Sequence, residues 1–122
     1  MTLLDLIARS PHLFNTAQDW YKGERFANTR NAPPKSGMMP TAFLPCPDAK
    51  EATLAGHGLP FAVNLVQLYT EHPGHWIWKK WLWCADTDSQ GQRVFVGATD
   101  RGMEIHRHLH LTPRFGCAVW EE

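Results

Sequence analysis

The fold is decided by a stretch near the C-terminus, RVFVGATDRGMEIHRHLHLT at residues 93–112. Its first four residues are typical of a buried strand, because branched and aromatic side chains favour extended backbone. Thr99-Asp-Arg-Gly102 then predicts a turn, since glycine and aspartate are common turn residues. Residues 103–112 alternate in polarity at period two, as a second strand would. The stretch therefore predicts an antiparallel pair of strands.

The same pattern continues on both sides of this pair. Residues 75–85 read as a strand, and residues 86–91 form a polar loop before the strand at 93–96. Residues 113–116 predict another turn, and residues 117–120 a short last strand. Short loops between consecutive strands favour an antiparallel meander. We expect an α+β fold in which N-terminal helices pack on an antiparallel β-meander of four to five strands.

The first 30 residues predict helices. Thr2 stands three residues before Asp5, which is the spacing of a capping box. Ser10-Pro11 interrupts this helix, and a second helix is expected from Asn15 or Thr16, with Trp20 and Phe26 facing the core.

Residues 31–58 form a Pro-rich connection, and residues 59–122 are expected to form the β-meander. Within 61–69 both alternate faces are apolar, so a strand and a buried helix both remain open. The length of the chain suggests a single domain over residues 1–122.

Composition narrows the class of partner. Lys plus Arg and Asp plus Glu number 12 each, so the formal net charge is zero. The signs are mixed along the chain, with no block of one charge, which argues against the basic stripe with which proteins hold nucleic acid but leaves a local basic patch open. A protein or small ligand is therefore the favoured partner. Asn64 and Gln67 interrupt the longest apolar stretch, so no membrane span is expected. The odd cysteine count, three without a C-x-x-C pair, predicts a reduced, cytoplasmic setting.

Three histidines at period two, His106, His108 and His110, place their imidazoles on one face of the predicted strand. Neighbouring imidazoles on that face lie roughly 7 Å apart, so two can converge on one ion more easily than three. A metal site would need another ligand, and the candidates are Glu104 on the same face and the turn residues His72 and His75. The alternative is a polar outer face of a half-buried sheet. No cofactor is required, and a divalent metal is the one that these residues could hold.

His108-Leu109-His110 resembles the His-hydrophobic-His strand motif of rolling-circle replication initiators and relaxases. The resemblance covers these three residues. In those enzymes the histidine pair holds a divalent ion and a tyrosine attacks a DNA phosphodiester, so the resemblance implies Tyr21 or Tyr69 as the nucleophile.

Four tryptophans and two lysines lie in WIWKKWLW at residues 76–83. A regular strand would divide the tryptophans between its two faces, whereas a bulge at the lysines would bring all four to one face. At least two of the four are expected in the core. Aromatic and basic side chains together suit a binding surface. The candidate binding residues are Trp76, Trp78, Lys79, Lys80, Trp81 and Trp83.

Three functions follow from these observations. The leading hypothesis is a small non-enzymatic binding module that contacts a protein, a small ligand or unpaired nucleic acid through a sheet face bearing Trp, Lys and His. The second is a metal-dependent enzyme, acting on phosphodiesters, built on the histidine strand. The third is a structural accessory protein without a ligand.

Overall fold

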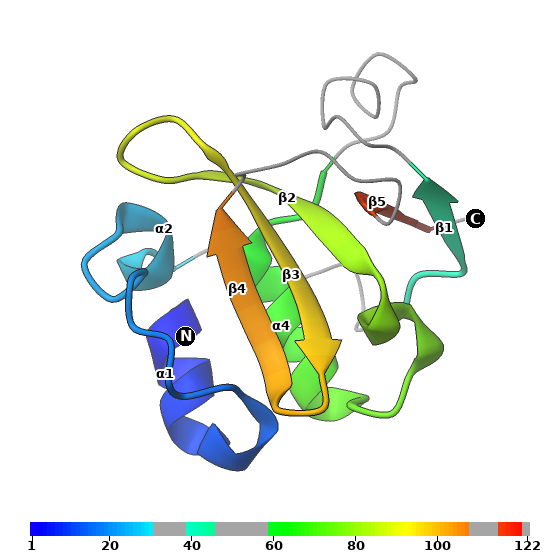
Figure 1. The fold of residues 1–122 in the computed structure, drawn as a ribbon, viewed down its shortest axis with the longest axis horizontal. Helices are drawn as coiled ribbons and strands as arrows, with labels where there is room; N and C mark the ends of the chain where they lie inside the picture. Colours follow the sequence, from blue (N-terminus) through cyan, green and yellow to red (C-terminus); the bar gives the residue numbers. More distant parts are fainter. Residues whose placement is uncertain (31–38, 46–58, 108–114, 121–122) are drawn as a thin grey trace.

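The computed structural model describes residues 1–30, 39–45, 59–107 and 115–120, and Figure 1 shows their arrangement. The helices are α1 (Leu3–Arg9), α2 (Arg25–Asn28) and α4 (Ala62–Glu71), with the 3-10 turns η1 (Pro11–Leu13) and η3 (Trp76–Lys79). The strands are β1 (Ala42–Pro45), β2 (Trp81–Thr87), β3 (Arg93–Thr99), β4 (Gly102–Arg107) and β5 (Phe115–Val119). The predicted α+β class is confirmed.

The sheet is mixed, with the strand order β1-β5-β2-β3-β4. The pairs β2–β3 and β3–β4 are antiparallel hairpins, as the loops predict. β5, in contrast, pairs parallel with β2 and antiparallel with β1, and β1 lies inside the predicted Pro-rich connection. An uninterrupted meander was therefore the wrong expectation. Polarity at period two marks a strand but carries no information on which neighbour it pairs with.

Residues 59–122 do not begin with a strand, because α4 occupies 62–71. Both readings of this segment satisfied the apolar pattern, and the helix buries most of its circumference, leaving Asn64 and Gln67 only partly covered. The carboxylate of Asp86, on β2, accepts a hydrogen bond of 2.6 Å from the backbone N–H of Ala62. A side chain from the sheet thus satisfies an amide in the first turn of the helix, where intrahelical partners are missing.

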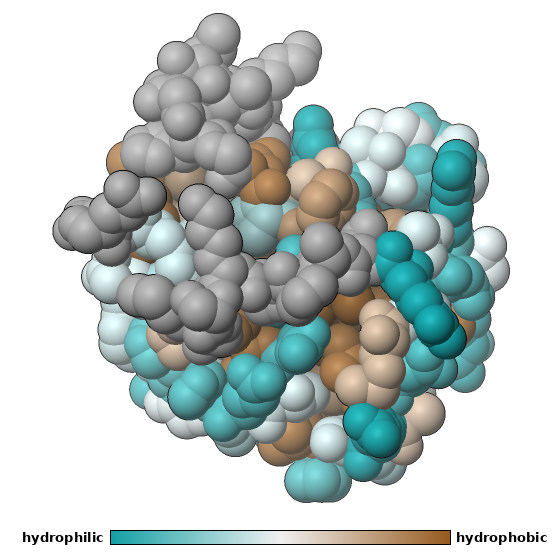
Figure 2. Space-filling view, turned by 180° about the vertical axis from the view of Figure 1, so that it is seen from behind, coloured by the Kyte–Doolittle hydropathy of each residue, from teal (hydrophilic) through white to brown (hydrophobic). Residues whose placement is uncertain are grey.

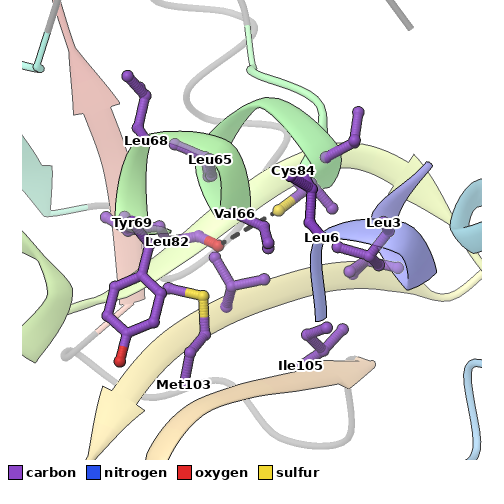
Figure 3. Packing of buried hydrophobic residues seen from close by; sticks show 14 of the residues in the cluster. Leu3, Leu6, Leu65, Val66, Leu68, Tyr69, Leu82, Cys84, Met103 and Ile105 are labelled. Atoms are coloured by element: carbon purple, nitrogen blue, oxygen red, sulfur yellow. Dashed lines mark hydrogen bonds between the residues drawn. The ribbon is translucent and has the colours of Figure 1, made fainter. Parts of the chain in front are cut away.

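The main core lies between α4 and the inner face of the sheet (Figure 3). That face is largely aliphatic, and it presents Leu82, Cys84, Val94, Val96, Met103 and Ile105. α1 adds Leu3 and Leu6 to this core and packs beside α4. The helix that contacts the middle of the sheet is therefore α4, and not the N-terminal helices as expected. On the side of the molecule that faces away from the viewer in Figure 1, hydrophobic residues reach the surface between hydrophilic ones (Figure 2).

The segment from Asn15 to Trp20 lies along the edge strand β4. The Asn15 N–H donates to the Met103 carbonyl at 3.0 Å. Gln18 Oε1 accepts from the Ile105 N–H at 2.9 Å, and Trp20 Nε1 donates to the Ile105 carbonyl at 2.8 Å. The predicted second helix shortens to α2. Ahead of it the segment bonds to the sheet and forms turns, such as the one in which the Gln18 N–H donates to the Asn15 carbonyl at 3.3 Å.

Candidate functional site

The outer face of the sheet, opposite α4, is aromatic. Trp83, Phe95 and Phe115 come from three adjacent strands and form a buried cluster. Their ring centroids lie 5.5 Å apart for Trp83–Phe95, 5.0 Å for Trp83–Phe115 and 4.6 Å for Phe95–Phe115. Tilted and edge-on arrangements at such distances are favourable for aromatic pairs. We call this cluster, with Trp81 and His106 at its border, the aromatic face.

The Trp81 ring lies close to Gly97 on β3. A Cβ atom built at Gly97 would lie 2.5 Å from the Trp81 ring and 2.8 Å from the Lys80 carbonyl oxygen. The missing side chain is therefore what lets the indole approach the backbone. From this position Trp81 meets Phe95 at 5.6 Å and His106 at 5.4 Å, edge to face in both pairs.

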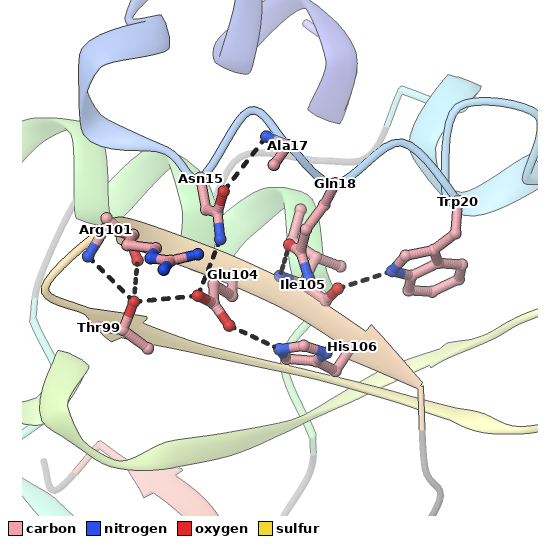
Figure 4. A network of polar contacts seen from close by, with 10 residues as sticks. Asn15, Ala17, Gln18, Trp20, Thr99, Arg101, Glu104, Ile105 and His106 are labelled. Carbon is pink, nitrogen blue, oxygen red and sulfur yellow. Dashed lines mark hydrogen bonds and ion pairs between the residues drawn. The ribbon is translucent and has the colours of Figure 1, made fainter.

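His106 and Glu104 form a hydrogen-bonded pair on the same face. His106 Nε2 and Glu104 Oε1 are 2.9 Å apart (Figure 4). The His106 ring also stacks on Phe95, with the ring centroids 5.5 Å apart. Glu104 Oε2 accepts hydrogen bonds of 3.0 Å from Asn15 Nδ2 and from Thr99 Oγ1. The side chain of His106 is 35% exposed, whereas that of Glu104 is 16% exposed. Solvent thus reaches the imidazole more than the carboxylate that holds it.

The pair fixes which nitrogen of His106 is open to a ligand. Burial raises the pKa of Glu104, but hydrogen bonds from Asn15, His106 and Thr99 outweigh it, and the net pKa lies below 4.5. An ionised carboxylate can only accept, so the neutral His106 ring carries its hydrogen on Nε2. Nδ1 is then a hydrogen-bond acceptor, a proton acceptor or a metal ligand.

Only some of the predicted metal ligands belong to the residues that the structure describes. His106 lies beside Glu104 as expected, while His108 and His110 lie outside the described residues. His72 ends α4, and His75 begins η3, where its Nδ1 accepts from the Ile77 N–H at 3.3 Å. Within the described ranges, no three His, Cys, Asp or Glu side chains are grouped closely enough to hold a metal ion.

The tryptophan-rich segment does not form one strand. Residues 76–79 form the turn η3, and the strand begins only at Trp81. The regular strand and the bulged strand that we predicted both require side chains to alternate at period two, and a 3-10 turn does not have this period. Trp78 is buried in the main core and Trp83 in the aromatic face, which confirms that at least two of the four are core residues. Trp76 is exposed, Trp81 is partly exposed, and both Lys79 and Lys80 are exposed.

Neither tyrosine is placed as the nucleophile that the His-hydrophobic-His resemblance implies. Tyr21 and Tyr69 are 3% and 4% exposed. The Tyr69 hydroxyl donates to the Leu13 carbonyl at 2.7 Å. Burial is the main cause that raises the pKa of both phenols, which disfavours the phenolate that would attack a phosphodiester.

Sequence reasoning missed the residues that support His106. Asn15 and Thr99 are far from one another in the chain, and no local pattern links them to Glu104. The position of Trp81 did have a signal, because a glycine inside a strand often marks a close approach of another group. Gly97, in the middle of an apolar strand, indicated such an approach.

No helix in the described ranges is long and apolar enough to cross a membrane. Comparisons with protein-family models, with curated proteins and with solved structures find no match for this chain.

Proposed function

We propose that this protein is a small binding module that takes its partner at the border of the aromatic face, on Trp81 and His106. The observation that carries the proposal is the contact between these two rings at 5.4 Å, next to the Glu104–His106 hydrogen bond of 2.9 Å. Binding sites of small ligands commonly combine apolar and aromatic walls with a few fixed polar groups. Both kinds of group meet at this border.

The chemistry of the border defines the partner. Trp81 offers an aromatic surface, and Nδ1 of His106 offers one hydrogen-bond acceptor. A ring that carries a hydrogen-bond donor, in a small ligand or on a protein side chain, matches both. Unpaired nucleic acid fits less well, because the chain has equal numbers of basic and acidic residues and a backbone phosphate needs cationic partners.

Phenol and indole are suitable probes, since each joins an aromatic ring to a single donor. We expect them to shift the Trp81 indole resonance in a titration followed by NMR. His106→Ala should weaken the binding by about tenfold, the loss that corresponds to one good contact. His12→Ala is the matched control, because His12 is an exposed histidine on η1. Equal affinities of the two variants would contradict the proposal.

A second candidate is a metal-dependent enzyme, and one observation favours it. Metal-ligating histidines usually donate their other ring N–H to a carboxylate. Glu104 holds His106 in this way, with Asn15 and Thr99 behind it. His108 and His110 are the further ligands that the sequence predicts.

Elemental analysis of untagged protein tests this second candidate. A stoichiometric transition metal that is lost in His106→Ala and in His108→Ala would support it, and phosphodiester hydrolysis would then be assayed. A folded protein without metal would exclude it. If phenol, indole and metal all fail to bind, the structural accessory role is what remains.

We also propose a reducing, cytoplasmic setting. Cys84 is a free and buried thiol, which supports this proposal because thiols persist where disulfides are reduced.

A further inference from the structure

The turn η3 has one face in the core and one in solvent. Side chains three residues apart eclipse in a 3-10 helix, so Trp76 and Lys79 share one side of the turn. Ile77 and Trp78 are 0% and 1% exposed, whereas Trp76 is 47% exposed. The turn therefore presents an indole and an ammonium group together, on the side away from the core.

Contacts of the buried Trp78 side chain and a backbone hydrogen bond fix the position of the turn η3. Trp78 Nε1 donates to the His72 carbonyl at 2.8 Å, and the Trp78 ring meets Tyr69 edge to face at 5.6 Å. The Lys80 N–H donates to the Ile77 carbonyl at 3.0 Å and closes the turn. A partner would thus meet a preformed backbone, and binding would cost little ordering entropy.

The indole of Trp76 is itself held in place. The His75 ring lies 5.4 Å from the Trp76 ring at an interplanar angle of 32°. His75 is fixed in turn, because its Nδ1 accepts the Ile77 N–H. Large rigid aromatic side chains of this kind dominate the energy of many protein interfaces.

The turn and the residue after it also carry positive charge, at Lys79 and Lys80. Among the described residues, neither Lys79 nor Lys80 forms an ion pair with a carboxylate. Lys80 Nζ lies 5.4 Å above the Phe43 ring, a contact that leaves its charge uncompensated. An acidic partner would supply the missing carboxylates.

We propose that Trp76, Lys79 and Lys80 form a docking point for an acidic segment of a partner protein, in which an apolar side chain covers the indole and carboxylates pair with the lysines. A nucleic acid strand would also stack on an indole, but it needs cationic contacts along its backbone. The whole chain has zero formal net charge, which favours the protein partner. This docking point does not use Trp81 or His106, so it is independent of the function proposed above.

The test uses a short synthetic peptide in which Asp and Glu alternate with Leu, and a matched peptide with Asn and Gln in place of the acids. We expect the acidic peptide to shift the Trp76 indole resonance, and the neutral peptide to leave it in place. Trp76→Ala should weaken binding by about tenfold, as loss of an interface anchor does. The double variant Lys79→Gln with Lys80→Gln should weaken it as well, and added salt should reproduce that effect in the wild type.

Two control variants make the result specific. Phe61→Ala removes another exposed apolar side chain, which is 44% exposed, and Lys22→Gln removes another exposed lysine. Both should bind the acidic peptide as the wild type does. The indole signals of Trp78 and Trp83 report whether each variant is folded.

Three outcomes would overturn the proposal: no shift with the acidic peptide, equal weakening by Phe61→Ala, or tighter binding of oligo-deoxythymidine or of phosphatidylserine vesicles than of the peptide.

Discussion

The two faces of the sheet are built from different side chains. The inner face is aliphatic, and residues such as Leu82, Val96 and Ile105 lie fully buried in the main core. The outer face is aromatic at its centre and polar at its border, where Glu104 and His106 stay partly open to solvent. The same strands supply both faces, since side chains alternate along a strand. The residues of the inner face hold the fold together, whereas those at the border of the outer face are open enough to contact a partner.

The largest effect is expected on the inner face. Leu82→Ala removes a fully buried side chain and should lower the free energy of unfolding by about 2–5 kcal/mol, the range for such cavities. Urea denaturation measures this loss. A cost near that of a surface substitution would show that the inner face is not the main source of stability.

Overpacking tests the contact between Trp81 and Gly97 on the outer face. Gly97→Ala places a Cβ where the Trp81 ring and the Lys80 carbonyl lie, and should cost about 1–3 kcal/mol. In a Trp81→Ala background the cost should fall, because the ring no longer competes for the space, although the carbonyl remains. Equal costs in both backgrounds would mean that the indole does not depend on Gly97.

The polar border should contribute a pH-dependent part of the stability. The folded pKa of Glu104 lies below its ordinary value of 4.5, so its stabilising effect is present above 4.5 and is lost as the pH falls through the folded pKa. Glu104→Gln should remove this dependence and cost about 1 kcal/mol at neutral pH, the worth of a typical hydrogen bond. Denaturation of both proteins from neutral to acidic pH shows the difference. Parallel curves would contradict this account of Glu104.

The smallest effect on stability is expected from His106→Ala. Its side chain is 35% exposed, so unfolding should change by less than about 1 kcal/mol, even though binding of phenol or indole is weakened. The thermal midpoint and the ligand titration are measured on the same sample. A large loss of stability would contradict this expectation and show that the packing of the outer face depends on His106.

Local patterns predicted those parts of the fold that depend on near neighbours in the chain. The loops at 86–91 and 99–102 predicted the two hairpins, and period two correctly separated Ile105 from Glu104 and His106. Residues 61–69 carried too little information, because a segment apolar on every side fits a buried helix and a buried strand equally.

Features that depend on distant residues were not predictable. β5 follows β4 in the chain but pairs with β2, which is two strands away from β4 in the sheet, and no local pattern predicts this parallel pairing. Asn15 reaches Glu104 across 89 positions of sequence, so no spacing rule brings them together. The prediction for the tryptophan segment failed for a local reason, because the turn η3 occupies residues 76–79 and the strand begins only at Trp81.

The hydrogen bonds that Gln18 and Trp20 make with Ile105 bear on self-association, because β4 is an edge strand of the sheet. An edge strand with free N–H and C=O groups is a template on which a second chain can add a strand and begin to aggregate. Here side chains from the N-terminal segment occupy both main-chain groups of Ile105. An amide and an indole from outside the sheet thus occupy main-chain groups of Ile105 with which a second chain could otherwise pair.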